Sequence, residues 1–349
     1  IVNSNGNWSA PFTIENLSSY AHCSIAVDSH GNPHIAYWNG THLKYTSSST
    51  GIWNQPTIFD QVTSSSSHQE LFIDGNDNVY IMYHNSTDKS LSLRTYDGAA
   101  WSDSTIDNSS YATFSHAGRA ALYVDLNEDV HVAYFRNYGN SNFEFMYSTY
   151  NGSTWSNSSV DSSVTNSAGA SLLVDSNSTV HVAYGSEESD GLELKHATLS
   201  GSGWSSSVID SSQAGSGTSL AIDAADNLYL LYTKEAAAYE VSFASFDGTT
   251  WGSRTLSVNE SMNSKIQMKP DSNHNLVGIY QSYENAGDDL ELLFGTSDYI
   301  PNSVIKVDFQ GHGNVTATLV NNSTITVISP QGPSEGGNAT VTVWFEGQG

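Results

Sequence analysis

The chain has 349 residues, of which 36 are acidic and 11 are Lys or Arg, so its formal net charge is −25. So few basic residues exclude a surface built to bind a nucleic-acid backbone, because phosphate recognition needs clustered Lys and Arg. The sequence also lacks the roughly 18–20 consecutive apolar residues of a membrane-spanning helix, whereas its 19 Tyr, 12 Phe and 8 Trp can build a large core.

The first predicted element is a strand at residues 6–14, around Trp8. Its sequence matches two later segments, which begin at Trp101 and Trp204. From residue 24 onward, the chain then repeats one pattern every 46–51 residues. Each copy holds one apolar run that ends in Asp and a second run that ends in Tyr. The repeated residues are Asp28, Asp74, Asp125, Asp175 and Asp223, then Tyr37, Tyr83, Tyr134, Tyr184, Tyr232 and Tyr280.

Each copy contains four short runs of apolar or alternating character, which in the fifth copy are residues 218–223, 228–233, 240–245 and 250–258. Turn residues such as Asp247 and Gly248 separate these runs. Period-two patterns bounded by turn residues predict strands. Four strands in about 45–50 residues are typical of one blade of a β-propeller.

The sixth copy begins near Lys265 and has three predicted strands without the Trp segment of the other copies. The N-terminal strand supplies the missing segment, and a ring closed in this way leaves no open sheet edge. The sequence therefore predicts an all-β fold, a six-bladed β-propeller over residues 1–299 that is closed by the N-terminal strand.

Residues 300–349 depart from the repeat and hold four β-like runs, at 304–309, 315–319, 324–328 and 340–345. We expect a C-terminal β-strand extension or a small β domain. It either packs on the propeller, begins a further domain or lends a strand to a neighbouring molecule.

Three segments resemble the Asp-box (BNR-type) repeats of extracellular propellers: Ser245-Phe-Asp-Gly-Thr-Thr-Trp251, Thr95-Tyr-Asp-Gly-Ala-Ala-Trp101 and Thr149-Tyr-Asn-Gly-Ser-Thr-Trp155. The usual motif is Ser-x-Asp-x-Gly-x-x-Trp, so these copies are one residue shorter between Asp and Gly. The resemblance implies a hairpin turn and a Trp that seals the blade edge. It is specific for the fold and not for an activity, because sialidases, some polysaccharide lyases and many surface proteins share such repeats.

The resemblance to sialidases implies three arginines that grip a carboxylate. The chain has four arginines, and Arg94 and Arg254 fall on third and fourth predicted strands, away from the central channel. Arg119 and Arg136 alone are central, so sialidase activity is not expected. A propeller lyase instead needs a base, an acid and a cation that neutralises a uronate carboxylate. The candidates for these parts are His22, His68, His84, Tyr138 and Arg119.

A repeat protein supplies its own comparison, because a residue type present in every blade is structural and one present in a few blades is a candidate for function. The repeated Asp is interpreted as an Asx turn that caps each first hairpin, with a calcium loop at residues 74–78 as the alternative. A second recurring position is interpreted as packing between blades, with a zinc site as the alternative. Its residues are His34, Tyr80, His131, His181 and Tyr229.

One position varies in residue type from blade to blade. It lies where each innermost strand is expected to begin, six residues before the repeated Asp. That position holds His22, His68, Arg119, Gly169, Gly217 and Lys265. Loops that follow the second strand should emerge on the same face, and they carry Trp38, His42, His84, Arg136, Tyr138, Lys234 and Tyr283. The basic and aromatic members predict a binding site for an anionic or sugar ligand at one mouth of the channel. The candidate residues are His22, His68, Arg119, Lys265, Trp38, His84, Arg136 and Tyr138.

Acidic residues gather in two other loops. They are candidates for Ca²⁺ ligands, with solvated loop charge as the alternative: Glu187, Glu188, Asp190, Asp288 and Asp289, with Glu284 and Glu291 close by. The sequence requires no cofactor, and Ca²⁺ is the one ion that these clusters suggest.

Asn-x-Ser/Thr sequons are dense and predict a glycosylated protein that is extracellular or on the cell surface. They lie at Asn7, Asn16, Asn39, Asn85, Asn108, Asn151, Asn157, Asn177, Asn259, Asn314, Asn321, Asn322 and Asn338. The single cysteine, Cys23, excludes an intrachain disulfide, and its place on an inner strand predicts a buried side chain.

Three functions fit these observations. The first is a non-catalytic binding or adhesion propeller that recognises a glycan or a surface partner through the mouth. The second is a polysaccharide-active, lyase-like enzyme that uses the same His, Tyr and Arg residues. The third is a structural subunit of an extracellular layer or filament, self-assembled through residues 300–349.

Overall fold

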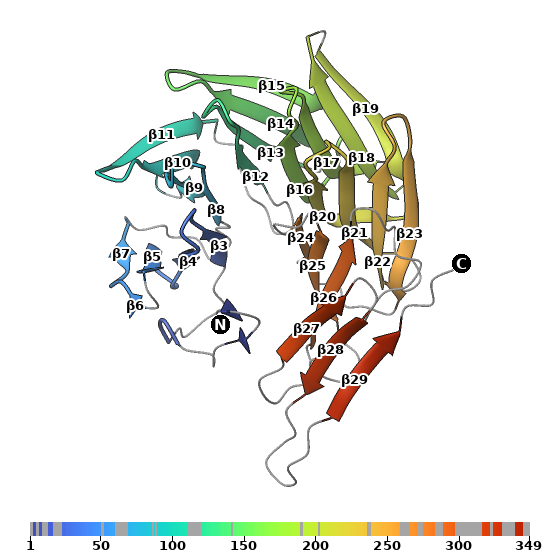
Figure 1. Cartoon of the computed structure of the whole chain (residues 1–349). Helices are drawn as coiled ribbons and strands as arrows, with labels where there is room; N and C mark the ends of the chain where they lie inside the picture. The colour runs from blue at the N-terminus through green and yellow to red at the C-terminus, as the bar shows by residue number, and fades with distance from the viewer. Residues whose placement is uncertain are drawn as a thin grey trace.

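A computed structural model of the whole chain shows the arrangement of its strands (Figure 1). The structure describes residues 3–4, 7–8, 13–16, 23–49, 52–59, 69–85, 87, 89–109, 120–140, 142–188, 191–201, 203–235, 239–258, 266–270, 275–282, 289–296, 316–321, 324–329 and 339–344. All regular elements among these residues are strands. No helix in this part of the chain is long and apolar enough to cross a membrane.

Six antiparallel sheets follow one another in chain order, and we number them as blades 1 to 6. Blade 1 consists of β3 (Cys23–Val27), β4 (Pro33–Trp38), β5 (Leu43–Ser49), β6 (Ile52–Trp53) and β7 (Thr57–Ile58). Blade 2 consists of β8 (Gln69–Ile73), β9 (Val79–Asn85), β10 (Ser90–Tyr96) and β11 (Trp101–Asp107). Blade 3 consists of β12 (Ala121–Val124), β13 (Val130–Gly139), β14 (Asn142–Tyr150) and β15 (Trp155–Asp161).

The second half of the ring repeats this order. Blade 4 consists of β16 (Ser167–Val174), β17 (Val180–Glu188), β18 (Gly191–Ser200) and β19 (Gly203–Asp210). Blade 5 consists of β20 (Ala214–Ile222), β21 (Leu228–Glu235), β22 (Tyr239–Phe246) and β23 (Trp251–Val258). Blade 6 has three strands, β24 (Ile266–Pro270), β25 (Asn275–Ser282) and β26 (Asp289–Thr296).

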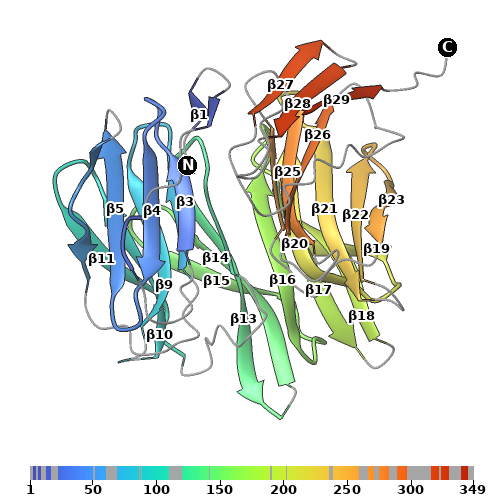
Figure 2. The same ribbon diagram turned by 90° about the horizontal axis from the view of Figure 1, so that it is seen from below.

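The first strand of each blade is the innermost, and successive strands lie farther outward (Figure 2). The inner strands contact one another in series, from β3 to β8, β12, β16, β20 and β24. This arrangement of sheets confirms the all-β, six-bladed propeller architecture. We call the side on which second strands end and third strands begin the rim face.

The repeated Asp closes the first hairpin of each blade, as the sequence predicts. Asp74 Oδ1 accepts hydrogen bonds from the backbone N–H groups of Asn76 and Asn78, both at 2.9 Å. Its other oxygen accepts the Tyr80 hydroxyl at 2.9 Å, so the recurring ring position has a bonded polar tip. The third residue after Asp adopts a positive φ in five blades, at Gly31, Asp77, Glu128, Ser178 and Asp226. These carboxylates therefore serve as Asx turns.

Two polar devices join consecutive blades. Ser24, Ser171 and Ser219 each accept the backbone N–H of the next inner strand, at 2.9–3.1 Å. The blade-edge tryptophans reach back to the preceding blade, where Trp155 Nε1 donates to Ser104 and Trp204 Nε1 donates to Ser158. The Ser bonds join the inner strands of blades 1 and 2, 4 and 5, and 5 and 6, and the Trp bonds join the outer strands of blades 2 and 3 and of blades 3 and 4. Buried apolar side chains also fill the junctions.

Blades 4 and 5 approach more closely than side chains allow. A Cβ atom on Gly169 would lie 2.9 Å from Gly217 Cα, and one on Gly185 would lie 2.4 Å from the Gly215 carbonyl oxygen. The inner-strand position that holds His or Arg in blades 1 to 3 is therefore Gly169 and Gly217 here because two backbones meet.

The N-terminal segment does not complete blade 6 in the described part of the chain. Trp8 lies in β2 (Asn7–Trp8), which pairs with β1 (Asn3–Ser4), and residues 13–16 form no strand. A strand that pairs with its close sequence neighbour closes a short loop, which costs less chain entropy than pairing with a segment nearly the whole chain away. The predicted closure by this strand is not confirmed.

The C-terminal segment forms a separate three-stranded sheet of β27 (Thr316–Asn321), β28 (Thr324–Ser329) and β29 (Ala339–Trp344). These strands match three of the four predicted runs, and the run at 304–309 lies outside the described residues. In Figure 1 they lie beside β26. The division of the chain at residue 299 stays a prediction.

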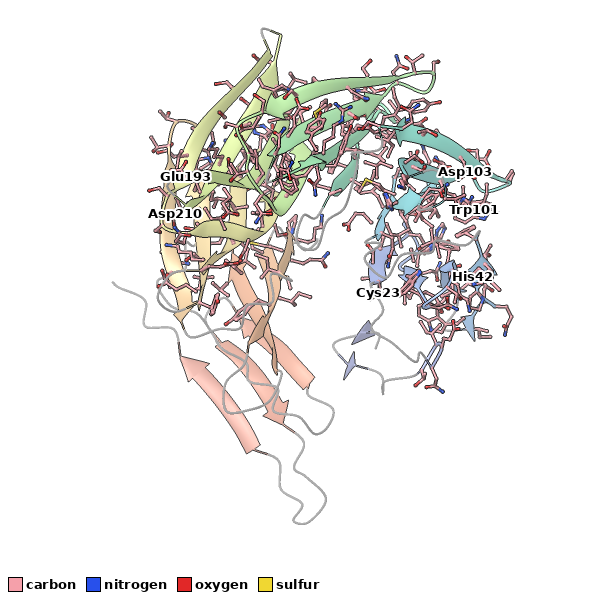
Figure 3. All side chains as sticks on the ribbon, turned by 180° about the vertical axis from the view of Figure 1, so that it is seen from behind. Cys23, His42, Trp101, Asp103, Glu193 and Asp210 are labelled. Carbon is pink, nitrogen blue, oxygen red and sulfur yellow. The ribbon has the colours of Figure 1, made fainter. Side chains whose placement is uncertain are left out.

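Cys23 is exposed on β3 (Figure 3), so the prediction of a buried thiol is wrong. Ile25 on the same strand is 57% exposed, whereas Leu71, its counterpart in blade 2, is 5% exposed. Inner strands are covered by the blade on each side, and β3 makes its extensive contact with blade 2. The side chains on its other side therefore remain accessible.

We predict that Gly185→Ala destabilises the protein by about 2–3 kcal/mol, because the added Cβ overpacks the junction of blades 4 and 5. Gly252→Ala is the matched control, since its Cβ would meet nothing within 4 Å. Urea unfolding measures both variants. An equal, small change for the two would show that the blades can separate without cost.

Candidate functional site

The predicted mouth residues divide into two groups. His22, His68, Arg119 and Lys265 lie outside the described residues, so their placement stays a prediction. Trp38, His84, Arg136 and Tyr138 are described, and all four lie at or near the ends of second strands, on the rim face.

Trp38 and His84 do not offer an open binding surface. Trp38 is 5% exposed and belongs to the core between blades 1 and 2, so its ring cannot stack on a ligand. The signal that predicted it was position alone, and burial decides against it. His84 is half-buried near the end of β9, opposite Leu91 of β10.

Arg136 and Tyr138 belong to one cluster, which we call the blade 3 rim cluster: Asp107, Tyr134, Arg136, Tyr138 and Glu144. Arg136 Nε donates to Asp107 Oδ2 at 2.7 Å, and Tyr134 donates to the same oxygen at 2.8 Å. The Tyr138 hydroxyl donates to Glu144 Oε2 at 2.7 Å, and Arg136 Nη1 lies 3.8 Å from that oxygen. The two tyrosines, the guanidinium and the two carboxylates therefore form one continuous network.

The strands explain this geometry. Arg136 on β13 and Glu144 on β14 are cross-strand partners, so their side chains lie on one face of blade 3. Asp107 is the last residue of β11 in the preceding blade. The cluster thus spans the junction between blades 2 and 3. Its buried half is the Tyr134–Asp107–Arg136 set, and its exposed half is Tyr138 and Glu144 with the outer part of the Arg136 guanidinium. The buried half holds the exposed half in place.

The electrostatics favour the charged forms of the buried pair. Burial opposes the charge of Asp107, but the hydrogen bonds from Arg136 and Ser109 outweigh it and hold the pKa of that carboxyl below its usual value. The pKa of Tyr138 is raised by partial burial and by its hydrogen bond to Glu144. Both tyrosines therefore stay protonated and donate.

The buried half of the cluster recurs in other blades. A closing Tyr donates to a carboxylate that also pairs with a cation, in the sets Tyr37/Glu15/Lys44, Tyr184/Asp161/Lys195 and Tyr232/Asp210/Lys234. Asp210 appears at the end of blade 4 in Figure 3. Because this set recurs, it is structural. The acidic residues of these sets were not predicted from the sequence. A signal was present, because successive Trp segments end in Ile106-Asp107, Val160-Asp161 and Ile209-Asp210.

In the described part of blades 1 to 4, the exposed Tyr of this cluster is found in blade 3. Tyr138 is 38% exposed, and it follows the closing Tyr134 by four residues. The same position in blades 1, 2 and 4 holds Thr41, Thr87 and Glu188. An exposed aromatic ring with a bonded hydroxyl therefore distinguishes this blade.

Two described cations of the rim face, Arg136 and Lys234, are paired, whereas Lys89 is exposed in the turn between β9 and β10. Arg136 lies near Asp107 and Glu144, and Lys234 lies near Asp210 and Glu240 at 2.8 and 3.9 Å. Each of these cations meets two carboxylates, so each group carries a net negative charge. The prediction that Arg136 attracts an anion is therefore not supported, because two carboxylates already neutralise its charge.

The acidic loops show no metal geometry in the described part of the chain. Glu187 is half-buried, and its carbonyl accepts Thr165 N–H at 2.8 Å. Glu188 ends β17, and Asp289 begins β26 opposite Ser282, while Asp190 and Asp288 lie outside the described residues. No group of three or more His, Cys, Asp or Glu among the described residues is placed to hold a metal ion.

The sequons differ in accessibility. Asn16, Asn108, Asn151, Asn157 and Asn177 are exposed, and Asn39 and Asn85 are half-buried. Asn7 and Asn321 lie in strands, and the remaining four, Asn259, Asn314, Asn322 and Asn338, lie outside the described residues. Glycosylation stays a prediction.

No protein-family model matches the chain, and no curated protein matches its sequence significantly. Solved structures do share its fold. The BP39L lectin from Burkholderia pseudomallei superposes with a TM-score of 0.64 at 12% identity, covering 94% of this chain and 97% of the lectin. The six-bladed fucose lectin of Aleuria aurantia gives 0.54 at 13% identity over 82% of this chain and 94% of the lectin. A PL25 ulvan lyase gives 0.56 at 11% identity over 86% and 88%. These similarities establish the fold.

We predict that Asp107→Asn destabilises the protein by about 3 kcal/mol, because it breaks a buried ion pair and leaves Arg136 without its anchor. Asp103→Asn is the matched control, since Asp103 also pairs with an arginine, Arg94, but its side chain is 50% exposed. Its loss should cost about 1 kcal/mol or less. Chemical unfolding at pH 7 measures both, and equal losses would contradict the structural role of the buried acid.

Proposed function

We propose that the protein is a non-catalytic propeller that binds glycans through the exposed half of the blade 3 rim cluster. The observation that carries this proposal is the ring of Tyr138, which is 38% exposed and fixed through its hydroxyl to Glu144 at 2.7 Å. Aromatic rings that pair an apolar face with a bonded polar end suit the faces and hydroxyls of sugars.

The cluster is organised before any ligand arrives. Tyr138 is fixed by Glu144, and the guanidinium of Arg136 is fixed by Asp107, whose side chain is 3% exposed. A side chain that is already ordered loses little conformational entropy on binding. The buried half of the cluster is therefore the support, and the exposed half is the contact surface.

The polar groups beside the ring complement sugar hydroxyls. The side chains of Arg136 and Glu144 are 19% and 21% exposed, so both reach the surface. A guanidinium donates several hydrogen bonds and a carboxylate accepts several. One hydroxyl can donate to Glu144 while its neighbour accepts from Arg136, and bonds to charged groups are the stronger kind.

The charge of the cluster favours neutral sugars. Asp107, Glu144 and Arg136 together carry one net negative charge, in a chain whose formal net charge is −25. A uronate or sulfate would be repelled. A lyase needs a cation to neutralise a uronate. Arg136 is already paired, so this cluster favours binding of a neutral sugar, while Arg119, the cation expected for a lyase, lies outside the described residues.

The comparisons support the proposal at the level of the fold. Two of the similar structures are lectins and one is an ulvan lyase, so this architecture is compatible with carbohydrate ligands. The particular sugars that those proteins bind are not assigned to this chain. A location outside the cell or on its surface is part of the proposal, and the exposed sequons support it.

Tyr138→Ala should weaken binding to a neutral oligosaccharide about tenfold or more, because it removes the stacking ring. Tyr138→Phe keeps the ring but loses the bond to Glu144, so it should weaken binding less. A panel of neutral and uronate-containing oligosaccharides, screened on an array and titrated by calorimetry, provides the measurement.

Leu126→Ala is the control, since Leu126 is 99% exposed in a first-hairpin turn on the opposite face. Its affinity should equal that of the unmodified protein. The proposal is overturned if no neutral glycan binds, or if Tyr138→Ala and Leu126→Ala bind alike. Cleavage of a uronate polymer would restore the lyase alternative.

A further inference from the structure

Two buried histidines of blade 4 form a stacked pair that the proposed function does not use. His181 on β17 and His196 on β18 are 8% and 4% exposed. Their rings are parallel within 2°, with centroids 5.3 Å apart, and His181 Nδ1 lies 3.1 Å from His196 Nε2. Trp251 of blade 5 packs edge-on against His196.

The hydrogen bonds assign every proton of this pair. An indole N–H can only donate, and Trp251 Nε1 lies 3.3 Å from His196 Nδ1, so this nitrogen accepts. His196 Nε2 then carries the proton and donates to His181 Nδ1. His181 in turn carries its proton on Nε2, which faces Asp175 Oδ2 at 3.3 Å.

This chain of donors has no place for a further proton. If His196 Nδ1 were protonated, two N–H donors, those of His196 and Trp251, would face each other. If His181 Nδ1 were protonated, the N–H groups of His181 and His196 would do the same. Either event breaks a buried hydrogen bond and leaves a charge between blades 4 and 5. Each cost is large in a buried site.

The corresponding histidines of blades 1 and 3 can keep their hydrogen bond when they take up a proton, although burial lowers the pKa of His131 as well. In blades 1 and 3 the partner is a hydroxyl, because His34 Nδ1 lies 2.6 Å from Tyr45 and His131 Nδ1 lies 2.6 Å from Tyr147. A hydroxyl rotates and accepts when the imidazole donates. Blade 2 has no histidine here and instead uses Tyr80 with Leu93.

Few charges surround the pair. Asp175, at the end of β16, contacts His181, and Asp226, in the first-hairpin turn of blade 5, acts on His181 from farther away. Phe246 of β22 and Trp251 of β23 cover His196. The carboxylates lie on the His181 side, so His196 has no acidic partner among the described groups that face it.

We propose that the His181–His196 pair is an acid-sensitive seam, at which blade 5 separates locally from blade 4 as the pH falls below about 6.5. The contact that opens is the one between Trp251 and His196. The junction between blades 2 and 3, where blade 2 has no histidine at this position, stays closed in the same pH range.

The direction follows from proton linkage. Burial lowers the pKa of His196 to about 3, with a smaller contribution from His181, and burial also lowers the pKa of His181. The open state titrates near the ordinary value of about 6.5. The open state therefore takes up a proton that closed His196 excludes, and closure weakens by about tenfold per pH unit below that value; the lowered pKa of His181 acts in the same direction.

Hydrogen–deuterium exchange from pH 7.5 to 5.5, corrected for the intrinsic pH dependence of exchange, tests the seam. Backbone amides of β23 in blade 5 should lose about tenfold or more protection over this range. Those of β15, which packs on the histidine-free position of blade 2, should not. This comparison needs no variant. The range also lies above the titration of the carboxylates, whose ordinary pKa values are near 4.

His196→Tyr copies Tyr147 of blade 3 and should remove the pH dependence at β23. His181→Tyr copies Tyr229 of blade 5 and should reduce it. The inference is overturned if β23 and β15 respond alike in the unmodified protein, or if His196→Tyr retains the pH dependence.

Discussion

Each blade of this propeller buries one face on the next blade, so every polar group on that face needs a partner across the junction. The Tyr–carboxylate–cation sets meet this need. Tyr134 and Asp107 come from consecutive blades, and Arg136 neutralises the charge that their bond would otherwise bury. Both the order of the blades and the shape of the rim face depend on these bonds.

The same constraint explains why junctions differ. Blades 4 and 5 meet through glycines, so their backbones come into contact where Gly169 meets Gly217 and where Gly185 meets Gly215. Farther out, the same junction holds His196 where blades 1 and 3 hold tyrosines. The buried polar groups at different junctions have different partners, so the junctions differ in stability. Local opening begins at the least stable junction.

Much of the fold could be predicted from the sequence, because its signals are local. The partners of the Asx turn at Asp74 lie within six residues of it. The Trp segments likewise predict the outer strands. The acid of each buried set was missed because its partners lie in another blade: Asp107 is 27 and 29 residues from Tyr134 and Arg136.

The differences between the predictions and the structure have the same origin. Trp38 looked like a ligand contact because its position in the repeat was known and its burial was not. The N-terminal segment has the sequence of an outer strand, but in the described residues it pairs with its own neighbour. Cys23 is exposed because burial of an inner strand depends on the adjacent blades. In the candidate site, Tyr138 and Arg136 could be predicted, but the hydrogen bond from Tyr138 to Glu144 and the ion pair of Arg136 with Glu144 could not.

We propose that Tyr138, Arg136 and Glu144 contact the glycan. A crystal structure of the protein with a bound neutral oligosaccharide tests it most directly. The account predicts density for a sugar ring stacked on Tyr138, with hydroxyls bonded to Glu144 and Arg136. A sugar bound only at another position, with Tyr138 free, would contradict it.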